Sequence, residues 1–395
     1  MIKLYTAFTK EIDNSQKAVE EIIEQLNPEK NKLKNTIGII YFYYEFVETG
    51  TYQAIVDAMP FEVVGCLSSY VEASGQYGDV ALSVTMITGD DVHFSVRTLD
   101  DPEAKTHEQI VDEVTQICKD FCVQGKPKLV MPFMTLQQNF SGDSLAATVN
   151  ALPESFPLFG TISFNMENTT GPHFVSGNGK ISSNMHVFVA FYGDFEPKFR
   201  VTSSFVFDDS FGDSVEITEA EDTVLKKVNG IPALQHLKRQ GMITSDNIVT
   251  GAYGIWAIPA ILTFPDGTRV VRSFVGVVEG TEHIHSTGEM SVGAKIKFAN
   301  LDGEKTLASA TKLFKELCDT KENGVIAYSC AARAWSLGTK FSGEMQKVAE
   351  CVNEFNPSMN YSLTYSGGEI CPVIDNSGKL VNVLHNCTLV SCVLC

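Results

Sequence analysis

The residue types in this chain that are best suited to chemistry lie close together near its C-terminus. Cys330 and Arg333 follow an apolar run that is typical of a buried strand, and Glu369 follows the glycine pair Gly367-Gly368. Glycines allow a ligand to approach the backbone, a carboxylate can accept hydrogen bonds from an amine, and a guanidinium can hold a carboxylate in a bidentate fork. An acid and a base at strand ends would therefore suit an amino-acid-like ligand. The same pattern is also typical of a structural pair, in which Glu369 bonds Arg333 or a local turn amide.

A cysteine nucleophile is the first alternative. Cys371 lies beside Glu369 and within reach of a folded-back His385, and a Cys-His pair with a carboxylate could run acyl transfer. Ser329, Cys330 and Arg333 could equally line a binding pocket or bond the backbone at the end of their strand. The chain has no G-x-S-x-G nucleophile elbow. We therefore expect binding rather than catalysis, with a ligand-free interaction scaffold as the other alternative.

Metal and nucleotide sites have weaker support. His283 and His285 could share one face of a strand, but no carboxylate or cysteine lies at a sequence spacing from them that is typical of metal ligands. Cys392 and Cys395 have C-x-x-C spacing without the second ligand pair that a zinc site needs. The chain also lacks both glycine-rich phosphate-binding motifs. We expect no metal and no cofactor.

The composition limits the class of protein. The chain has 395 residues, which predicts two or three domains, and a formal net charge of -18, which argues against a nucleic-acid partner. No apolar run approaches the roughly 18 residues that span a membrane, and the N-terminus lacks the apolar core of a signal peptide. The ten cysteines are scattered and several lie on apolar stripes, which is typical of buried reduced thiols. We expect a cytoplasmic protein.

One pattern of elements occurs three times. Each copy reads as a strand, a helix, a second strand, a glycine-containing turn and a third strand, and the copies begin near Asn35, Lys126 and Asn323. The predicted fold class is α/β, with repeated strand-helix-strand-turn-strand units that form mixed sheets flanked by helices. Gly65, Gly160 and Gly367 are expected at corresponding points. Ligands usually bind beyond the carboxyl ends of strands in such sheets.

The rest of the chain divides around these copies. The strand "IKLYTAF" and a helix from Ser15 to Leu26 suggest a partial copy at the start of the chain. In the second copy, Ser141 or Asp143 is expected to cap the helix. Residues 205–300 have shorter strands and more turn signals. We place the main boundary near residue 204, which gives domains of residues 1–204 and 205–395.

At this point the motifs resemble a known family. The segments "YSCAAR" (328–333), "TYSGGEICP" (364–372) and "LHNCTL" (384–389) are similar to the C-terminal domain of FIST proteins, whose pattern is cysteine-x-x-arginine, glycine-glutamate-x-x-proline and histidine-asparagine-x-threonine. "VVGCLSSYVE" (63–72) resembles the glycine-cysteine-serine turn of the N-terminal FIST domain, although Tyr70-Val71-Glu72 replaces the usual glycine-glutamate pair. The resemblance implies ligand-binding roles for the following residues: Ser329, Cys330, Arg333, Tyr365, Gly367, Gly368, Glu369, Pro372, His385 and Asn386, with Gly65, Cys66, Ser68 and Ser69 in the N-terminal half.

The resemblance also implies a function. FIST domains are regarded as small-ligand-binding input modules of signal transduction, with amino acids or their derivatives as suspected ligands. They occur alone or joined to outputs such as kinases, cyclases or chemoreceptors, and a eukaryotic relative carries an F-box. The resemblance extends over nearly all 395 residues. We therefore expect a stand-alone sensor that passes its signal to a separate protein, such as a kinase or chemoreceptor.

Overall fold

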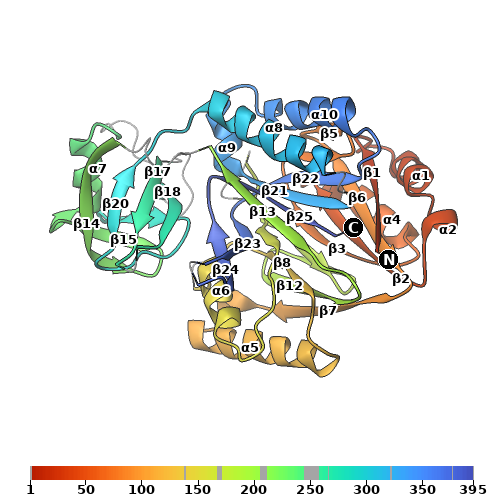
Figure 1. Cartoon of the computed structure of the whole chain (residues 1–395), viewed down its shortest axis with the longest axis horizontal. Helices are drawn as coiled ribbons and strands as arrows, with labels where there is room; N and C mark the ends of the chain where they lie inside the picture. Colours follow the sequence, from red (N-terminus) through yellow and green to blue (C-terminus); the bar gives the residue numbers. More distant parts are fainter. Residues whose placement is uncertain are drawn as a thin grey trace.

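The computed structural model describes residues 2–137, 139–166, 171–204, 211–243, 258–265, 267–320, 323–375 and 377–394. It consists of a large body of three sheets and a small barrel at one end (Figure 1). The predicted α/β class, with repeated units and mixed sheets flanked by helices, is confirmed.

The first unit starts with a strand that lies at the edge of its sheet. Its elements are, in order, β1 (Lys3–Thr9), α1 (Ser15–Leu26), α2 (Pro28–Asn31), β2 (Asn35–Phe42), α3 (Glu45–Glu48), α4 (Thr51–Ala58), β3 (Glu62–Leu67), β4 (Val71–Ala73), β5 (Gln76–Gly78) and β6 (Leu82–Gly89). The helix predicted from Ser15 to Leu26 is found as α1, where the Asn14 side chain accepts a hydrogen bond from the Lys17 amide at the N-terminus. β1 pairs with β6. The opening strand and helix are therefore the first two elements of the first unit and not a separate partial copy.

The second unit repeats this order of strands, helices and hairpin. It contains β7 (Val92–Asp100), the 3-10 turn η1 (Pro102–Ala104), α5 (His107–Val123), β8 (Leu129–Met134), α6 (Gly142–Asn150), β9 (Gly160–Ile162), β10 (Val175–Gly177), β11 (Lys180–Ser182) and β12 (Met185–Gly193). The predicted cap of α6 is Ser141, whose hydroxyl accepts a hydrogen bond from the Ser144 amide.

The third unit has the same order but is interrupted after its first strand. It contains β13 (Lys198–Ser203) and then, after the inserted barrel, α8 (Gly303–Asp319), β21 (Val325–Cys330), α9 (Ala331–Ser336), α10 (Gly343–Phe355), β22 (Tyr361–Ser366), β23 (Glu369–Ile374), β24 (Leu380–His385) and β25 (Thr388–Val393). The barrel contains β14 (Phe211–Glu221), β15 (Val224–Val228), β16 (Ile231–Pro232), α7 (Ala233–Arg239), β17 (Ile258–Thr263), β18 (Arg269–Val277), β19 (Ile284–Ser286) and β20 (Lys295–Phe298). β14 pairs with both β20 and β15, which closes the barrel.

Each sheet of the body is completed by a hairpin from another unit. The orders are β1-β6-β2-β3-β10-β11, β7-β12-β8-β9-β23-β24 and β13-β25-β21-β22-β4-β5. The hairpin of the first unit thus joins the third sheet, that of the second joins the first, and that of the third joins the second. Two of the three sheets combine strands from both sides of residue 204, and the boundary that we placed there stays a prediction.

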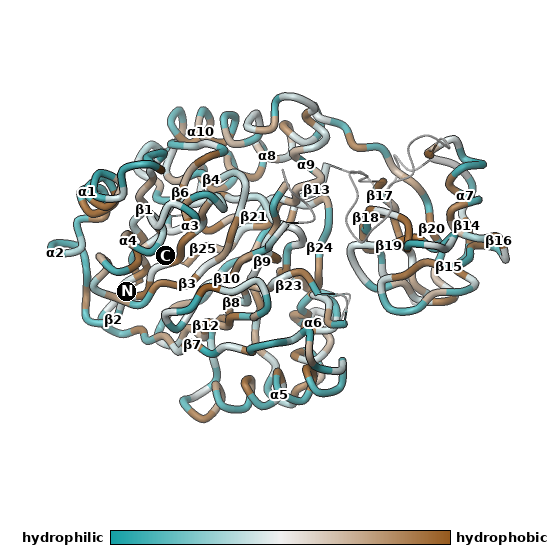
Figure 2. The backbone as a smooth tube through the Cα atoms, turned by 180° about the vertical axis from the view of Figure 1, so that it is seen from behind, coloured by the Kyte–Doolittle hydropathy of each residue, from teal (hydrophilic) through white to brown (hydrophobic). Residues whose placement is uncertain are grey.

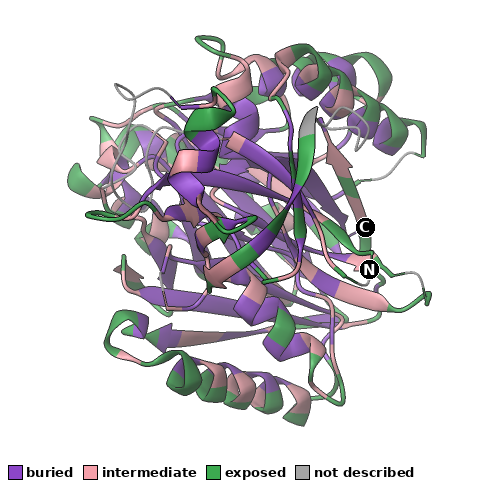
Figure 3. Ribbon diagram, turned by 90° about the vertical axis from the view of Figure 1, so that its left-hand side faces the viewer, coloured by how far each residue is buried: buried purple, intermediate pink, exposed green. Residues whose placement is uncertain are grey.

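The sheets are buried on both faces. In β2, Ile39 and Tyr41 point into a core shared by all three sheets, whereas Ile40 and Phe42 pack under the helices of their own unit. β8 and β21 alternate in the same way, and the Tyr41 and Tyr328 hydroxyls meet in the shared core, 2.7 Å apart. Continuous apolar runs are the sequence signal of such doubly covered strands. Apolar segments follow the strands in Figure 2, and Figure 3 shows the exposed residues mainly on helices and loops.

Gly65 and Gly160 occupy corresponding positions in the first and second units, and both lie in strands and not at turns. A Cβ on Gly65 would lie 1.8 Å from the Ile40 carbonyl oxygen, and one on Gly160 would lie 2.2 Å from that of Pro132. Each glycine stands two residues before the end of its strand, where the third unit has Thr364. The expectation that Gly367 corresponds to Gly65 and Gly160 was therefore wrong, because Gly367 follows β22.

Candidate functional site

The barrel meets the body at the carboxyl ends of strands in the second and third units. A buried ion pair joins the two parts, with Arg272 Nη2 on β18 lying 2.8 Å and 3.0 Å from the carboxylate oxygens of Asp143 on α6. Glu289 adds to this contact by accepting a hydrogen bond from the Ser144 hydroxyl, 2.8 Å away. An apolar cluster lies beside it and includes Ile261 and Val271 of the barrel and Ala332 and Trp335 of α9.

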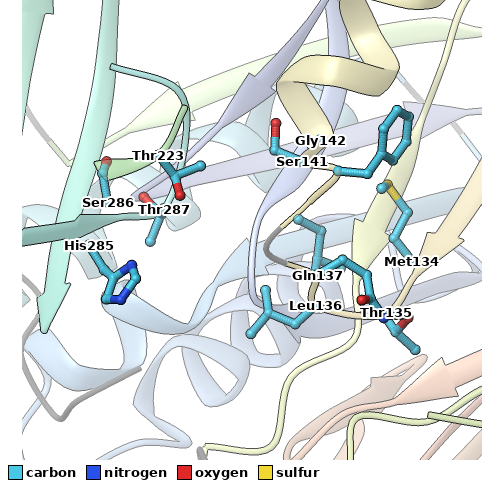
Figure 4. Close-up of a pocket in the computed structure, with 12 residues that line it drawn as sticks. Met134, Thr135, Leu136, Gln137, Ser141, Gly142, Thr223, His285, Ser286 and Thr287 are labelled. Atoms are coloured by element: carbon cyan, nitrogen blue, oxygen red, sulfur yellow. Dashed lines mark hydrogen bonds between the residues drawn. The ribbon is translucent and has the colours of Figure 1, made fainter. Parts of the chain in front are cut away.

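Two recesses lie in this contact region, which we call the cleft. The apolar recess is lined by Phe164, Ser273, Val275, Thr287, Cys330, Ala331, Ala332, Trp335, Ser366 and Gly367. The polar recess is lined by Met134, Thr135, Leu136, Gln137, Phe140, Ser141, Gly142, Ile162, Thr223, His285, Ser286 and Thr287. Figure 4 shows the polar recess, where Thr223, His285, Ser286 and Thr287 of the barrel face Ser141, Leu136 and Gln137 of the body.

Both recesses are narrow. Each has a cavity volume of about 30 Å³, enough only for a few water molecules. Thr287 lines both, and each recess has walls from the barrel and from the body. A larger ligand can therefore enter only if these walls move apart.

Two of the residues predicted to bind a ligand line the cleft. Cys330 ends β21 and Gly367 follows β22, so both stand at the carboxyl ends of parallel strands, as expected for a site in such a sheet. One side of Gly367 is already packed against the protein, because a Cβ on this residue would lie 3.2 Å from the Phe164 side chain.

Three more predicted residues lie directly behind this wall. Glu369 is fully buried; its Oε2 accepts a hydrogen bond from the Thr388 hydroxyl at 2.9 Å, and its Oε1 makes none with any described residue. Burial, followed by the nearby Cys330 thiol, raises the pKa of this carboxyl group well above its ordinary value. Asn386 is 1% exposed, and neither end of its amide has a hydrogen-bond partner among the described residues. Gly368 packs against it, since a Cβ there would lie 3.6 Å from Asn386 Nδ2.

Arg333 belongs to a different buried network. Its Nη2 lies 2.5 Å from Glu344 Oε1 on α10, its Nε donates to Ser329 Oγ and Glu344 Oε1, and both charged side chains are fully buried. Nη2 also donates to the Thr306 carbonyl oxygen. Tyr365 lies on the same side of the sheet as this network and donates to the Phe341 carbonyl oxygen at 3.0 Å. The charge of the guanidinium is thus paired with Glu344, although its Nη1 has no hydrogen-bond partner among the described residues.

The remaining predicted residues have structural contacts and do not line either recess. His385 contacts the Cys371 carbonyl oxygen through Nε2 at 3.0 Å, and burial lowers its pKa to about 4. Pro372 pairs with Asn382 inside the β23–β24 hairpin. In the first unit, Ser68 donates to the Tyr365 carbonyl oxygen at 3.0 Å and Ser69 accepts from the Met166 amide at 2.8 Å. Gly65 and Cys66 lie within β3. Ligand binding by these residues stays a prediction.

Cys330 and Cys371, the two candidate nucleophiles, have raised pKa values. A hydrogen bond with Cys387, together with burial, raises the pKa of the Cys330 thiol well above its ordinary value, and burial does the same for Cys371. Nucleophilic cysteines have lowered pKa values. Nine cysteines are free in the part of the chain that the structure describes; Cys395 lies outside it.

Several cleft residues were missed by the sequence reading. Phe164, Ser273, Val275, Thr287 and Trp335 were not among the predicted ligand-binding residues. Glu344 was missed as well, although a signal was present: it stands four residues before Val348 on the buried face of α10, where a charge needs a partner.

The described ranges contain no group of three or more His, Cys, Asp or Glu side chains placed to hold a metal ion. In the same ranges, no helix has the length and apolar character needed to cross a membrane.

The chain matches two family models in succession. The FIST N domain model matches residues 36–231, and the FIST C domain model matches residues 233–372. No curated protein is detectably similar in sequence. The two matches meet inside the barrel, next to β16.

Proposed function

We propose that this chain, which belongs to the FIST family through both an N and a C domain, is a cytoplasmic sensor that binds a small ligand in the cleft between barrel and body. FIST domains are associated with signal transduction and small-ligand sensing. The ligand is an amino acid or a derivative of one, and the binding event is relayed to a separate signalling protein. The observation that carries the proposal is the position of the cleft, at the strand ends and between two parts of the molecule.

The position of the cleft supplies a mechanism. Both recesses have walls from the barrel and from the body, and both are too small for an amino acid in this arrangement. A ligand that prefers a wider cleft shifts the population toward it and so changes the relative position of the two parts. A partner protein that contacts both parts would detect that change.

Binding rather than catalysis is proposed for this site. The raised pKa values of Cys330 and Cys371 and the engagement of His385 by a backbone carbonyl group support this choice. The orphaned groups of Glu369 and Asn386 support a ligand as well, because buried polar atoms normally have a partner.

Thermal unfolding with a panel of amino acids, amides and related metabolites tests the proposal. A ligand at about 100 times its dissociation constant stabilises the fold by roughly 2.7 kcal/mol. We expect one chemical class to raise the melting temperature of the wild type in a dose-dependent manner and to leave that of Ala332→Phe, which fills the apolar recess, unchanged. Ala58→Phe, at an exposed position on α4, is the matched control. Equal stabilisation of Ala332→Phe would contradict the location.

A further inference from the structure

The lining of the cleft carries almost no charge. The chain has 48 acidic and 30 basic side chains, yet among the described residues that line the two recesses only Cys330 and His285 are ionisable. The pKa of the Cys330 thiol is raised, and burial lowers that of the His285 imidazole. Both groups are therefore neutral near pH 7.

The nearest arginines form buried ion pairs, and Glu289 accepts hydrogen bonds from the Ser141 and Ser144 hydroxyl groups. Arg272 reaches past Gly288 to Asp143, and Arg333 is held by Glu344. Burial raises the pKa of the Glu369 carboxyl group behind the wall well above its ordinary value. Neither arginine can neutralise a ligand charge without first leaving a buried carboxylate unpaired, which is strongly unfavourable.

The available contacts are apolar surfaces and neutral hydrogen-bonding groups. The rings of Phe164 and Trp335 meet edge to face, with centroids 5.9 Å apart and planes at 74°, and Val275 lies on the barrel side of the same recess. Hydroxyl groups of Ser273 and Thr287 lie beside this apolar surface. Behind Gly367 and Ser366, the amide of Asn386 and the Oε1 atom of Glu369 have no hydrogen-bond partner among the described residues, although neither residue lines a recess. Amide groups match such partners, whereas free ammonium and carboxylate groups do not.

We infer that the cleft selects an uncharged amino-acid derivative, one whose amino and carboxyl groups are both masked, as in an N-acyl amide or a lactam, with its side chain against Phe164 and Trp335. This inference rests on the function proposed above. It excludes the free zwitterion as the preferred ligand, because burying two charges without counter-charges would offset the gain from the apolar contact.

Four forms of one amino acid provide the test. They are N-acetyl-L-leucine amide (neutral), N-acetyl-L-leucine (anionic), L-leucine amide (cationic) and L-leucine (zwitterionic). Binding is followed by the fluorescence of Trp335 in the full chain with Trp256, which lies outside the described residues, changed to Phe. We expect saturable binding of the neutral form at an affinity at least about tenfold above that of each charged form.

Blocking variants locate the binding. Ala332→Phe should abolish the response to the neutral form, and Ala58→Phe should leave it unchanged. If Ala332→Phe does not fold, Thr287→Met, at a half-buried position that lines both recesses, serves in its place and should weaken binding. Binding of the neutral form that neither variant affects would overturn the inference.

The possible failures are distinguishable. If L-leucine binds at least as tightly as the neutral form and Ala332→Phe abolishes its binding, the inference is wrong and the proposed sensor function stands. If the neutral form does not bind, the inference is wrong; the proposed function then fails with it only if the wider panel also yields no ligand that Ala332→Phe excludes.

Discussion

Arg333 directs its guanidinium at Glu344 on α10, inside the molecule, and Glu369 places its carboxyl group behind the wall of the cleft. Sequence reading identified both as chemically notable but expected them to hold opposite ends of one ligand. Residue type reveals that a buried arginine needs an anion; it does not reveal which one, because Glu344 and Arg333 meet only after α9 and α10 fold onto the sheet.

Removing the partner of Arg333 should destabilise the fold strongly. Glu344→Gln leaves the guanidinium buried without a counter-charge, and we expect a loss of about 3–5 kcal/mol in the free energy of unfolding. Urea titration measures it. Glu350→Gln on the same helix, whose exposed carboxylate pairs with Lys347, should change the free energy by no more than about 1 kcal/mol. Equal effects of the two substitutions would contradict the structural role of the buried pair.

Glu369 should make stability depend on pH. Its folded pKa is raised well above the unfolded value near 4.5, so the folded state holds a proton that the unfolded state releases as pH rises. The stability present below about pH 4.5 is therefore lost progressively between that pH and the folded pKa, by up to about 1.4 kcal/mol per pH unit. Glu369→Gln should reduce this slope and be more stable than the wild type at pH 8. Urea titrations from pH 4 to pH 8 measure the difference; Glu24→Gln, at an exposed position on α1, is the control, and an unchanged slope in Glu369→Gln would show that Glu369 is ionised.

At the scale of elements, the three-fold repeat followed directly from the sequence. Each unit has a strand whose β-branched and aromatic residues alternate between two buried faces. Such a strand is apolar along its whole length, and a continuous apolar run predicts a strand. The exchange of hairpins between units did not follow. The pairings of β4 with β22, β10 with β3 and β23 with β9 join segments far apart in the chain, and short strands carry no signal of their remote partners.

The correspondence of Gly65 with Gly160 gives a prediction at this scale. Both glycines let two parallel strands approach, so Gly65→Ala and Gly160→Ala should each destabilise the fold by about 1–3 kcal/mol or more. Gly343→Ala, where a Cβ would meet only ordinary contacts at 3.8–3.9 Å, should be neutral or slightly stabilising. Thermal unfolding measures all three. A neutral Gly65→Ala would show that β2 and β3 do not pair as described.

For the whole molecule, the sequence indicated shorter strands and more turns after residue 204, but it did not indicate that a barrel interrupts the third unit. The two parts of that unit, β13 and α8 onward, are joined in space by the pairing of β13 with β25. The cleft could not be predicted for the same reason: its walls come from seven separate stretches of the chain, and only five of its lining residues lie in the motifs that carry the family resemblance.

The contact between barrel and body should depend on one ion pair. Asp143→Asn leaves Arg272, whose side chain is 3% exposed, without its carboxylate, so the contact should weaken and hydrogen exchange of β18 and of residues 384–387 should accelerate. Asp100→Asn breaks the exposed pair with Lys180 and should leave exchange in these segments unchanged. Unchanged exchange in Asp143→Asn would show that the ion pair does not hold the barrel in place.

A crystal structure with the compound that most stabilises the protein would test the central claim most directly. The account predicts the compound in the cleft, in contact with Phe164, Trp335 and Thr287, with barrel and body farther apart than in Figure 1. A compound bound elsewhere, such as at the Ser68-Ser69 turn of the first unit, would contradict it.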